Sequence, residues 1–145
     1  MKINQNIFRA YDIRGIASED LSNEFVSSLG SSLSHKIKKL GLKQVAVARD
    51  GRLSGERICS ALVKSFLDNG INVINVGMVP SPLLYFAVEK FNTENGVMIT
   101  GSHNPKEYNG FKMILGGKTI LDKKFKILKM TYCKVHSQRK PRKVI

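Results

Sequence analysis

One hydroxyl group stands among turn-forming residues, in a position where it could do chemistry. Residues 100–112 read TGSHNPKEYNGFK, and Ser102 lies there between a glycine and a histidine. Thr100 and Asn104 occupy the glycine positions of the hydrolase pattern G-x-S-x-G, so that pattern fails. Ser102 and His103 are neighbours on an extended chain, where side chains point apart, and they cannot form a catalytic pair by themselves. Acyl transfer is therefore not expected.

A phosphate-binding pattern, the P-loop, fails as well. Gly117-Lys118-Thr119 matches the end of the P-loop pattern G-x-x-x-x-G-K-[ST], but the first glycine would fall on Lys112. Residues 113–115, Met-Ile-Leu, indicate a strand and not a cradle of backbone amides. We therefore reject a P-loop.

Phosphoryl transfer suits Ser102 better. A phosphoryl group carries roughly two negative charges, and amides in tight turns can form a nest that binds an anion. The reaction depends on positioning and on stabilising the charge of the transferring oxygens, and it needs a hydroxyl carrier, cations and usually Mg²⁺. Cations and one imidazole lie on or near the ends of expected strands: Arg14, Arg49, Arg52, His103 and Lys112.

Strands and helices alternate along the chain, which predicts a sheet that positions these residues. Strands are expected at 44–48, 71–76, 96–100 and 111–115, the last turned back at Tyr108-Asn109-Gly110. One helix is expected to be capped by Ser54, stopped by Asn69-Gly70 and buried through Ile58, Ala61, Leu62 and Leu67. Another opens with Ser81-Pro82 as cap and first residue and buries Leu84, Ala87, Val88 and Phe91.

The N-terminal part adds one more helix. Apolar residues recur every three to four positions from Leu21 to Leu40, with Ser18 as the expected cap and Glu19 and Asp20 in the first turn. FRAYDIRG, at 8–15, is expected to form a short strand that leads into a charged turn. The predicted fold class is α/β, with three layers and a mixed, mostly parallel sheet flanked by helices.

This architecture predicts where polar residues meet. In such sheets the ligand crevice lies beyond the carboxyl ends of the strands. The segments RDGR at 49–52, GMVPSP at 77–82 and TGSHNP at 100–105 all follow strands, so they should gather at one edge, with Arg14 close by.

Charge and composition narrow the class of protein. The net charge is +13, but residues 118–145 hold ten Lys or Arg against one acid, whereas residues 1–117 hold fourteen against ten. The basic excess thus belongs to the tail, and without a zinc-finger or RRM-type motif we do not expect nucleic-acid binding. No apolar run approaches the ~20 residues of a membrane span, and no signal peptide is evident. Two cysteines, Cys59 and Cys133, fit neither a disulfide framework nor a metal cluster, so a cytoplasmic protein is expected.

Four motifs in one order carry a resemblance. FRAYDIRG, ARDGRLSG, VPSP and TGSHNPKEYNGFK together resemble the N-terminal domain of the α-D-phosphohexomutases, in the phosphomannomutase/phosphoglucomutase branch, over roughly residues 7–117. Phosphoglucosamine mutases, the alternative branch, more often open with an FGTDGIRG-like segment and carry an ASHNP loop. FRAYDIRG and Gly101 favour the first branch.

The resemblance implies an activity and a set of site residues. Ser102 would carry the phosphoryl group, give it to a hexose 1- or 6-phosphate and take one back from the bisphosphate intermediate, with hexose 1,6-bisphosphate as activator. Its phosphate would also be one ligand of Mg²⁺. Lys112 and Arg14 would stabilise charge and assist proton transfer, while Tyr11, His103 and Asn104 would line the substrate side.

Ordinary structural explanations stand beside these roles. Arg14 could pair with Asp12 on the surface, and Lys112 could lie on the solvent face of its strand. The turn at 49–52 could be a helix-capping turn with an internal salt bridge. Asn109-Gly110 is expected first of all to be a hairpin turn.

The sequence also departs from the family. Complete phosphohexomutases have four domains and about three times this length, and the DGDGDR-type metal loop of their second domain is missing here. We expect residues 1–120 to form the first domain and 121–145 a basic tail, with one short helix followed by disorder; a truncated or frameshifted gene is our hypothesis for that tail. Without domains II–IV the chain should have little mutase activity alone. The rival hypothesis is a non-enzymatic module whose tail binds an anionic partner.

Overall fold

A six-stranded sheet forms the middle layer of the computed structural model, which describes residues 3–120. The strands lie in the order β1-β5-β4-β2-β3, and the short β6 pairs with β5. Their bounds are Ile13–Ile16 (β1), Gln44–Arg49 (β2), Asn72–Met78 (β3), Gly96–Ile99 (β4), Tyr108–Leu115 (β5) and Lys118–Thr119 (β6).

The strand pairings confirm a mixed sheet in which most strands run in the same direction. β2 pairs in parallel with both β3 and β4, whereas β5 is antiparallel to β4, β1 and β6. The first four strands therefore all run the same way, and β5 is reversed between β4 and β1. Their carboxyl ends meet at one edge of the sheet.

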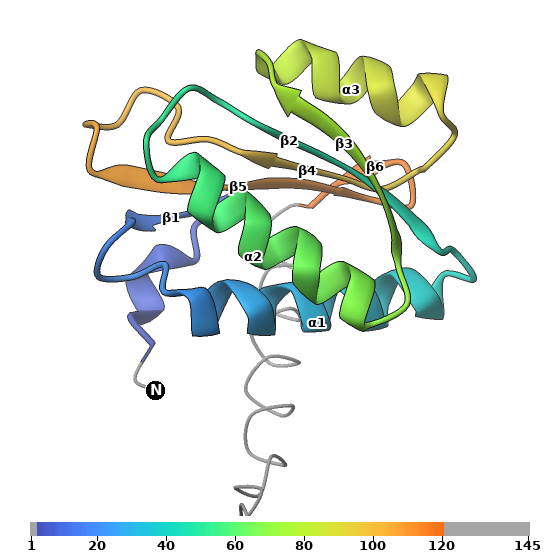
Figure 1. Cartoon of the computed structure of the whole chain (residues 1–145), viewed down its shortest axis with the longest axis horizontal. Coiled ribbons are helices and arrows are strands. Elements are labelled where there is room, and N and C mark those ends of the chain that lie inside the picture. The colour runs from blue at the N-terminus through green and yellow to red at the C-terminus, as the bar shows by residue number, and fades with distance from the viewer. Residues whose placement is uncertain (1–2, 121–145) are drawn as a thin grey trace, which may run out of the picture.

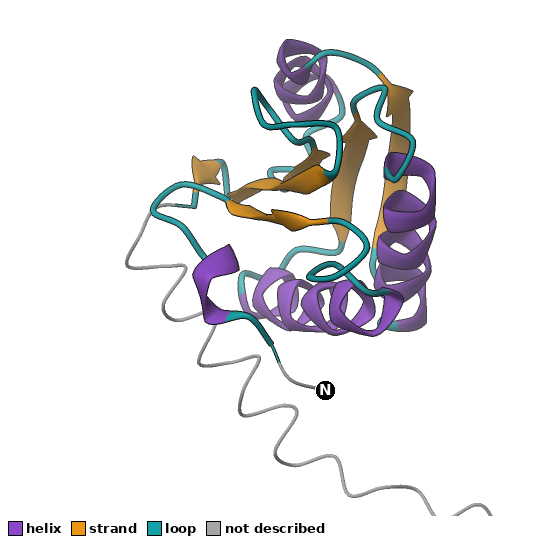
Figure 2. Cartoon of the chain, turned by 90° about the vertical axis from the view of Figure 1, so that its left-hand side faces the viewer, coloured by secondary structure: helices purple, strands orange, loops and turns teal. Residues whose placement is uncertain are grey.

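Helices cover both faces of this sheet (Figures 1 and 2). α1 (Asn23–Lys39) and α2 (Gly55–Asp68) lie on one face, and α3 (Ser81–Lys90) lies over β2, β3 and β4 on the other. A short 3-10 helix, η1 (Gln5–Ile7), stands near β1. The three layers predicted from the sequence are thus confirmed.

The central strand β2 is apolar on both of its faces. All residues from Val45 to Ala48 in β2 are buried, because both faces of the strand are covered. Val45 and Val47 belong to the larger core under α1 and α2, and Ala46 and Ala48 belong to a smaller core under α3. Small side chains on the α3 side let that helix pack close to the sheet.

The first helix begins later than predicted. Ser22, and not Ser18, is the N-cap, and its Oγ accepts a hydrogen bond from the Phe25 amide at 3.1 Å. The preceding residues are held in a turn, where the Asp20 carboxylate accepts a 2.8 Å bond from the amide of Ile16. Because that carboxylate is used within the turn, the helix starts only after it.

Other helix predictions were right in position but wrong in detail. Ser54 occupies the N-cap position of α2 without capping it, since its Oγ accepts instead from the Asn109 side-chain amide at 2.9 Å. Leu67 is 56% exposed, and Phe66 is buried in its place. In α3 Leu84, Ala87 and Val88 are buried as predicted, but Pro80 is the N-cap and Phe91 is exposed.

The predicted hairpin turn at Asn109-Gly110 was wrong. Both residues are buried inside β5, where Gly110 lies opposite Arg14 of β1. A Cβ on Gly110 would stand 2.0 Å from the Ile13 carbonyl oxygen, so this glycine serves close strand approach and not a turn. The order predicted for FRAYDIRG was also reversed, because a turn closed by the Phe8–Ile13 bridge precedes the strand.

The expectations for residues 121–145, a short helix and then disorder, lie outside the described residues. Within residues 3–120, no helix is both long and apolar enough to cross a membrane.

Candidate functional site

The loop of residues 100–107, here called the serine loop, connects β4 to β5 at the edge where the carboxyl ends of the strands meet. Ser102 is half-buried there and has a φ of 52°, in the left-handed region that residues other than glycine rarely adopt. Its amide donates to Thr100 Oγ1 at 2.9 Å. Strained backbone of this kind persists only where its surroundings hold it, and it clusters at functional sites.

The Arg52 side chain provides much of that hold. Its guanidinium donates to four backbone oxygens of the serine loop and of the start of β5. They are those of Pro105 (2.5 Å), Asn104 (2.8 Å), Tyr108 (3.1 Å) and Ser102 (3.1 Å). One guanidinium thus cross-links carbonyl groups from several positions along the loop.

Asp50 anchors the beginning of the same loop. Its carboxylate accepts from Thr100 Oγ1 at 2.9 Å and from the Gly101 amide at 3.2 Å. It also binds the Arg52 amide at 3.2 Å and forms an ion pair with Arg52 Nε at 3.3 Å. The internal salt bridge predicted for the 49–52 turn is therefore present, and the turn does more than start a helix.

Gly101 makes the Arg52 contacts sterically possible. A Cβ at this position would lie 2.2 Å from the Arg52 Cζ, far inside any real carbon–carbon contact. The guanidinium thus occupies the space that a side chain at 101 would need.

Arg14 comes to the serine loop from β1. Its Nη1 donates to the Asn104 side-chain oxygen at 2.7 Å, and its Nε and Nη2 contact the Asp12 carboxylate. The ion pair with Asp12 that the sequence allowed does form, but Asp12 is only 6% exposed, so the pair is not a solvated surface bridge. It orients the guanidinium toward the loop.

Lys112 lies on β5, two residues beyond Gly110, the partner of Arg14. Side chains two apart on a strand share a face, so Lys112 and Arg14 both project from the face of the sheet that carries α3. Lys112 is half-buried, and none of the described residues forms a hydrogen bond or ion pair with its ammonium group. Its charge is therefore not neutralised by a partner within this part of the chain.

The other predicted site residues are more exposed. Tyr11 lies in the turn between Phe8 and Ile13 with its side chain 69% exposed, and His103 is exposed on the serine loop. Asn104 is half-buried because it carries the contact to Arg14. The structure therefore joins Asn104 and Arg14 to the serine loop, whereas within the described residues the side chains of Tyr11 and His103 form no hydrogen bond or ion pair there.

Cys59 of α2 is not a second nucleophile. Burial raises the pKa of its thiol, and the nearby Arg49 guanidinium offsets only part of that rise. The thiol is thus neutral near pH 7 and fills the core like a small apolar side chain.

The described residues hold no group of three or more His, Cys, Asp or Glu that could bind a metal ion.

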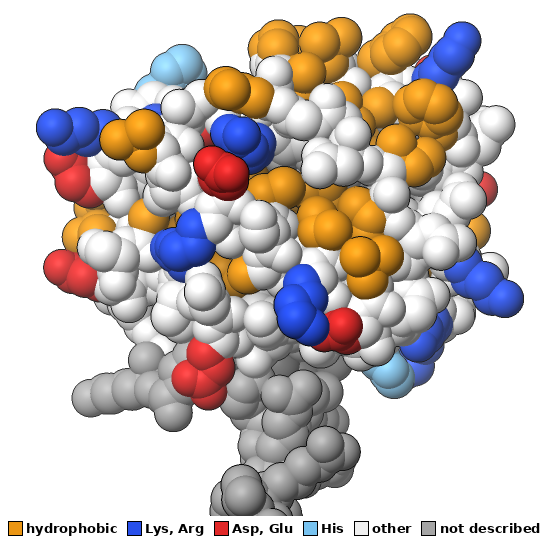
Figure 3. Space-filling view, in the orientation of Figure 1, with side chains coloured by type: hydrophobic (Ala, Val, Ile, Leu, Met, Phe, Trp, Pro, Cys, Tyr) orange, Lys and Arg blue, Asp and Glu red, His pale blue; other side chains and the backbone are white. Residues whose placement is uncertain are grey.

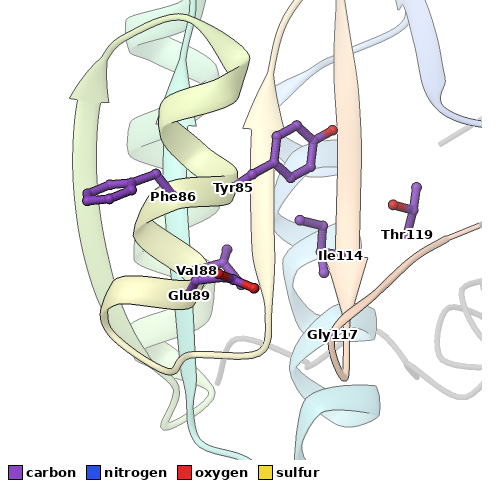
Figure 4. Close-up of a pocket in the computed structure, with 7 residues that line it drawn as sticks. All are labelled: Tyr85, Phe86, Val88, Glu89, Ile114, Gly117 and Thr119. Atoms are coloured by element: carbon purple, nitrogen blue, oxygen red, sulfur yellow. The ribbon is translucent and has the colours of Figure 1, made fainter.

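A cavity of about 380 Å³ lies between α3 and the β5–β6 hairpin, away from the serine loop (Figure 4). Figure 4 shows Tyr85 reaching from α3 toward β5 across this space. Hydrophobic side chains also gather over α3 at the surface (Figure 3).

Comparison with known proteins identifies the family. The family model described as phosphoglucomutase/phosphomannomutase, alpha/beta/alpha domain I, matches residues 5–137. This chain belongs to that family. The matched range extends further than residues 7–117, where the recognised motifs lie.

Individual relatives agree with this assignment. A phosphoglucomutase of Neisseria meningitidis serogroup B is 50% identical over 118 residues, and a phosphomannomutase/phosphoglucomutase of Pseudomonas putida is 44% identical over 123. These alignments cover 81% and 85% of this chain but only 26% and 27% of the relatives. A crystal structure of a family protein from Burkholderia thailandensis superposes with a TM-score of 0.86 at 37% identity, covering 93% of this chain and 31% of that one. The chain thus spans about a quarter of the curated relatives it matches.

Sequence reasoning underestimated one part of this mutase-family domain. Arg52 and Asp50 were recognised as cationic or turn-forming residues, but their hold on the serine loop was not foreseen. The available signal was the position of RDGR at the carboxyl end of β2, at the same sheet edge as TGSHNP. Which loop the Arg52 side chain would reach depends on the turn's conformation, which the sequence pattern does not specify.

Proposed function

We propose that this chain carries the phosphoserine of a phosphoglucomutase/phosphomannomutase-type enzyme. Ser102 would donate its phosphoryl group to a hexose 1- or 6-phosphate and recover one from the bisphosphate intermediate. The observation that carries the proposal is the left-handed Ser102 on a loop anchored by Arg52 and Asp50 and contacted by Arg14. Family membership supports the same chemistry.

The proposed step exchanges one P–O bond for another. The bond between Ser102 Oγ and phosphorus breaks, and a bond forms between phosphorus and a sugar hydroxyl oxygen. In the net balance the proton of that sugar hydroxyl passes to Ser102 Oγ, which becomes a free hydroxyl group again. Arg14 and Lys112 would offset charge on the transferring oxygens, which is where such enzymes gain most of their rate. Lys112 suits proton transfer better than Arg14, because a guanidinium does not give up its proton in proteins.

Substrate contacts are proposed for three residues: His103 and Asn104 on the serine loop, and Tyr11 in the turn between Phe8 and Ile13. His103 and Tyr11 present polar tips to solvent, and Asn104 can use the hydrogen-bonding capacity that Arg14 leaves free. Hexose phosphate is the proposed substrate class, and hexose 1,6-bisphosphate the proposed activator. Which hexose is preferred would depend on parts of the enzyme outside this chain.

Magnesium is the proposed metal cofactor of the complete enzyme. A phosphorylated Ser102 would supply one hard oxygen ligand, the kind that Mg²⁺ prefers. The described residues do not fit a complete site, since they contain no cluster of metal-binding side chains. Further ligands would have to come from elsewhere in the enzyme.

The direct test is phosphorylation of Ser102. Purified chain would be incubated with glucose 1,6-bisphosphate and Mg²⁺, and the phosphorylated residue located by mass spectrometry, with Ser102→Ala as the control. We expect one added phosphoryl group, confined to Ser102. Phosphate on another residue, or none when separately produced domains II–IV are also supplied, would refute the proposal.

We expect little mutase turnover from the chain alone. The chain spans about a quarter of its relatives, and a loop at an open sheet edge cannot exclude water from the reacting phosphoryl group. Multiple turnovers per minute with purified chain and no added domains would contradict this.

Binding of the basic tail to an anionic partner is a separate prediction. It is tested by measuring salt-dependent nucleic-acid binding, which deletion of residues 121–145 should remove.

A further inference from the structure

Every N–H group of the Arg52 guanidinium is already used. An arginine side chain has five N–H donors. Here Nε donates to Asp50, Nη1 to the carbonyls of Pro105 and Tyr108, and Nη2 to those of Ser102 and Asn104. Such a guanidinium has no donor left for a substrate phosphate. Arg52 is therefore not suited to bind ligand, although it lies beside the proposed site.

Hydrogen bonds hold both backbone polar groups of Ser102, its amide and its carbonyl. Its amide donates to Thr100 Oγ1, and its carbonyl accepts from Arg52 at 3.1 Å. Among the described residues, none forms a hydrogen bond with its hydroxyl group. The backbone is thus held in the left-handed conformation while the hydroxyl stays available.

Position 101 is coupled to this arrangement. A Cβ on Gly101 would lie 2.2 Å from Arg52 Cζ, 2.3 Å from Nε and 2.6 Å from Nη1. The end of a free arginine could swing away, but this one is tied by five hydrogen bonds. A side chain at 101 and the observed guanidinium position are therefore mutually exclusive.

We propose that Arg52 is the positioning residue for Ser102, and that in this chain the observed position of the Arg52 guanidinium depends on Gly101, which leaves room for it. The effect on phosphoryl transfer rests on the function proposed above, whereas the effect on loop order does not. Both substitutions, at 52 and at 101, should release the serine loop through the same lost contact.

Amide hydrogen exchange of the full chain tests the loop order directly. We expect Arg52→Lys and Gly101→Ala each to speed exchange across residues 101–108 by about tenfold or more, with exchange in β2 and β4 unchanged. A role that needs only positive charge would leave Arg52→Lys close to wild type. Unchanged serine-loop exchange in both variants would overturn the proposal.

Arg57 offers a matched control. It also donates three hydrogen bonds to a loop, to the oxygens of Ala17 (3.0 Å), Leu21 (3.0 Å) and the Asn23 side chain (2.8 Å). That loop leads from β1 into α1 and touches the serine loop at its far end, where the Ala17 amide donates to the Glu107 carbonyl at 2.8 Å. Arg57→Lys should therefore leave exchange of residues 101–106, around Ser102, unchanged. Equal acceleration in Arg57→Lys would mean that general destabilisation, and not the Arg52 contact, releases the serine loop.

Transfer kinetics provide the second readout. The rate at which glucose 1,6-bisphosphate phosphorylates Ser102 should fall about a hundredfold in Arg52→Lys and in Gly101→Ala, and stay unchanged in Arg57→Lys. The double variant should lose no more than the worse single one, because both act through one contact. Additive losses would overturn the coupling. If wild-type Ser102 takes no phosphate even when domains II–IV are supplied, the proposed function fails, and hydrogen exchange alone decides the role of Arg52.

Discussion

The Arg14 guanidinium donates a 2.7 Å hydrogen bond to the side-chain oxygen of Asn104, joining two residues that are 90 positions apart in the sequence. This contact ties the first strand of the sheet to the serine loop. It is made possible by β5, which pairs with β1 on one side and β4 on the other. The N-terminal motif FRAYDIRG and the motif TGSHNP thus become parts of one site.

A double-mutant cycle measures this link. Arg14→Gln, Asn104→Ala and the double variant should show a coupling of about 1–2 kcal/mol in the free energy of unfolding, measured in urea, because the bond is charge-assisted and half-buried. The Asp12 carboxylate left unpaired in both Arg14 variants cancels in the cycle. A coupling near zero would show that the contact contributes nothing in solution.

Replacing Lys112 should slow phosphoryl transfer without changing the stability of the fold. Lys112→Gln should leave the free energy of unfolding within about 0.5 kcal/mol of wild type, because none of the described residues pairs with its ammonium group. It should still slow phosphorylation of Ser102 about a hundredfold, because a cation near the transferring oxygens is lost. Lys118→Gln, on the exposed β6, is the matched control and should change neither quantity. Normal transfer in Lys112→Gln would remove Lys112 from the proposed site.

Gly110 should be intolerant of any side chain. Gly110→Ala would place a Cβ 2.0 Å from the Ile13 carbonyl oxygen, and the backbone of β1 cannot move without breaking its pairing with β5. We expect a loss of about 3 kcal/mol in urea unfolding. Gly51→Ala is the control, because its Cβ would meet only Met78 Sδ at an ordinary 3.5 Å. Equal effects of the two substitutions would contradict the close strand approach.

The Cys59 thiol should be protected in the folded chain. Burial raises its pKa above the usual value of 9.0, so little thiolate exists at neutral pH. In a Cys133→Ala background, labelling by a thiol reagent should be slow in buffer and fast in urea. The unfolded thiol ionises first as the pH rises, so the stability contributed by Cys59 is present below about pH 9 and lost above it. Fast labelling of the folded chain would contradict the burial.

The α/β class and most elements could be predicted because they depend on local patterns. Apolar runs such as Val45–Ala48 and the helical spacing of Leu84, Ala87 and Val88 follow from the need to bury side chains at periods of two and 3.6. The start of α1 could not be predicted as reliably. Ser18 and Ser22 both precede acidic residues, and only the turn closed by Asp20 decided between them.

The prediction of a hairpin turn at Asn109-Gly110 was wrong for a related reason. Asn-Gly is a strong turn signal in a local sequence pattern. That pattern contains no information about β1, which pairs with the same two residues. Gly110 is required by a neighbouring strand that comes from the opposite end of the chain. Pairings between distant segments override local preference at such positions.

By itself, the sequence determined the strand–helix order, the edge at which the polar motifs would gather, and Ser102 as the residue presented there. Those features follow from burial and from strand direction, which local patterns encode. Only the tertiary structure decided that the Arg52 guanidinium would donate to four carbonyls between Ser102 and Tyr108, that Gly101 would make room for it, and that Arg14 would reach Asn104. Hydrogen bonds between side chains and a distant backbone depend on where several loops meet, and only the folded chain brings those loops together.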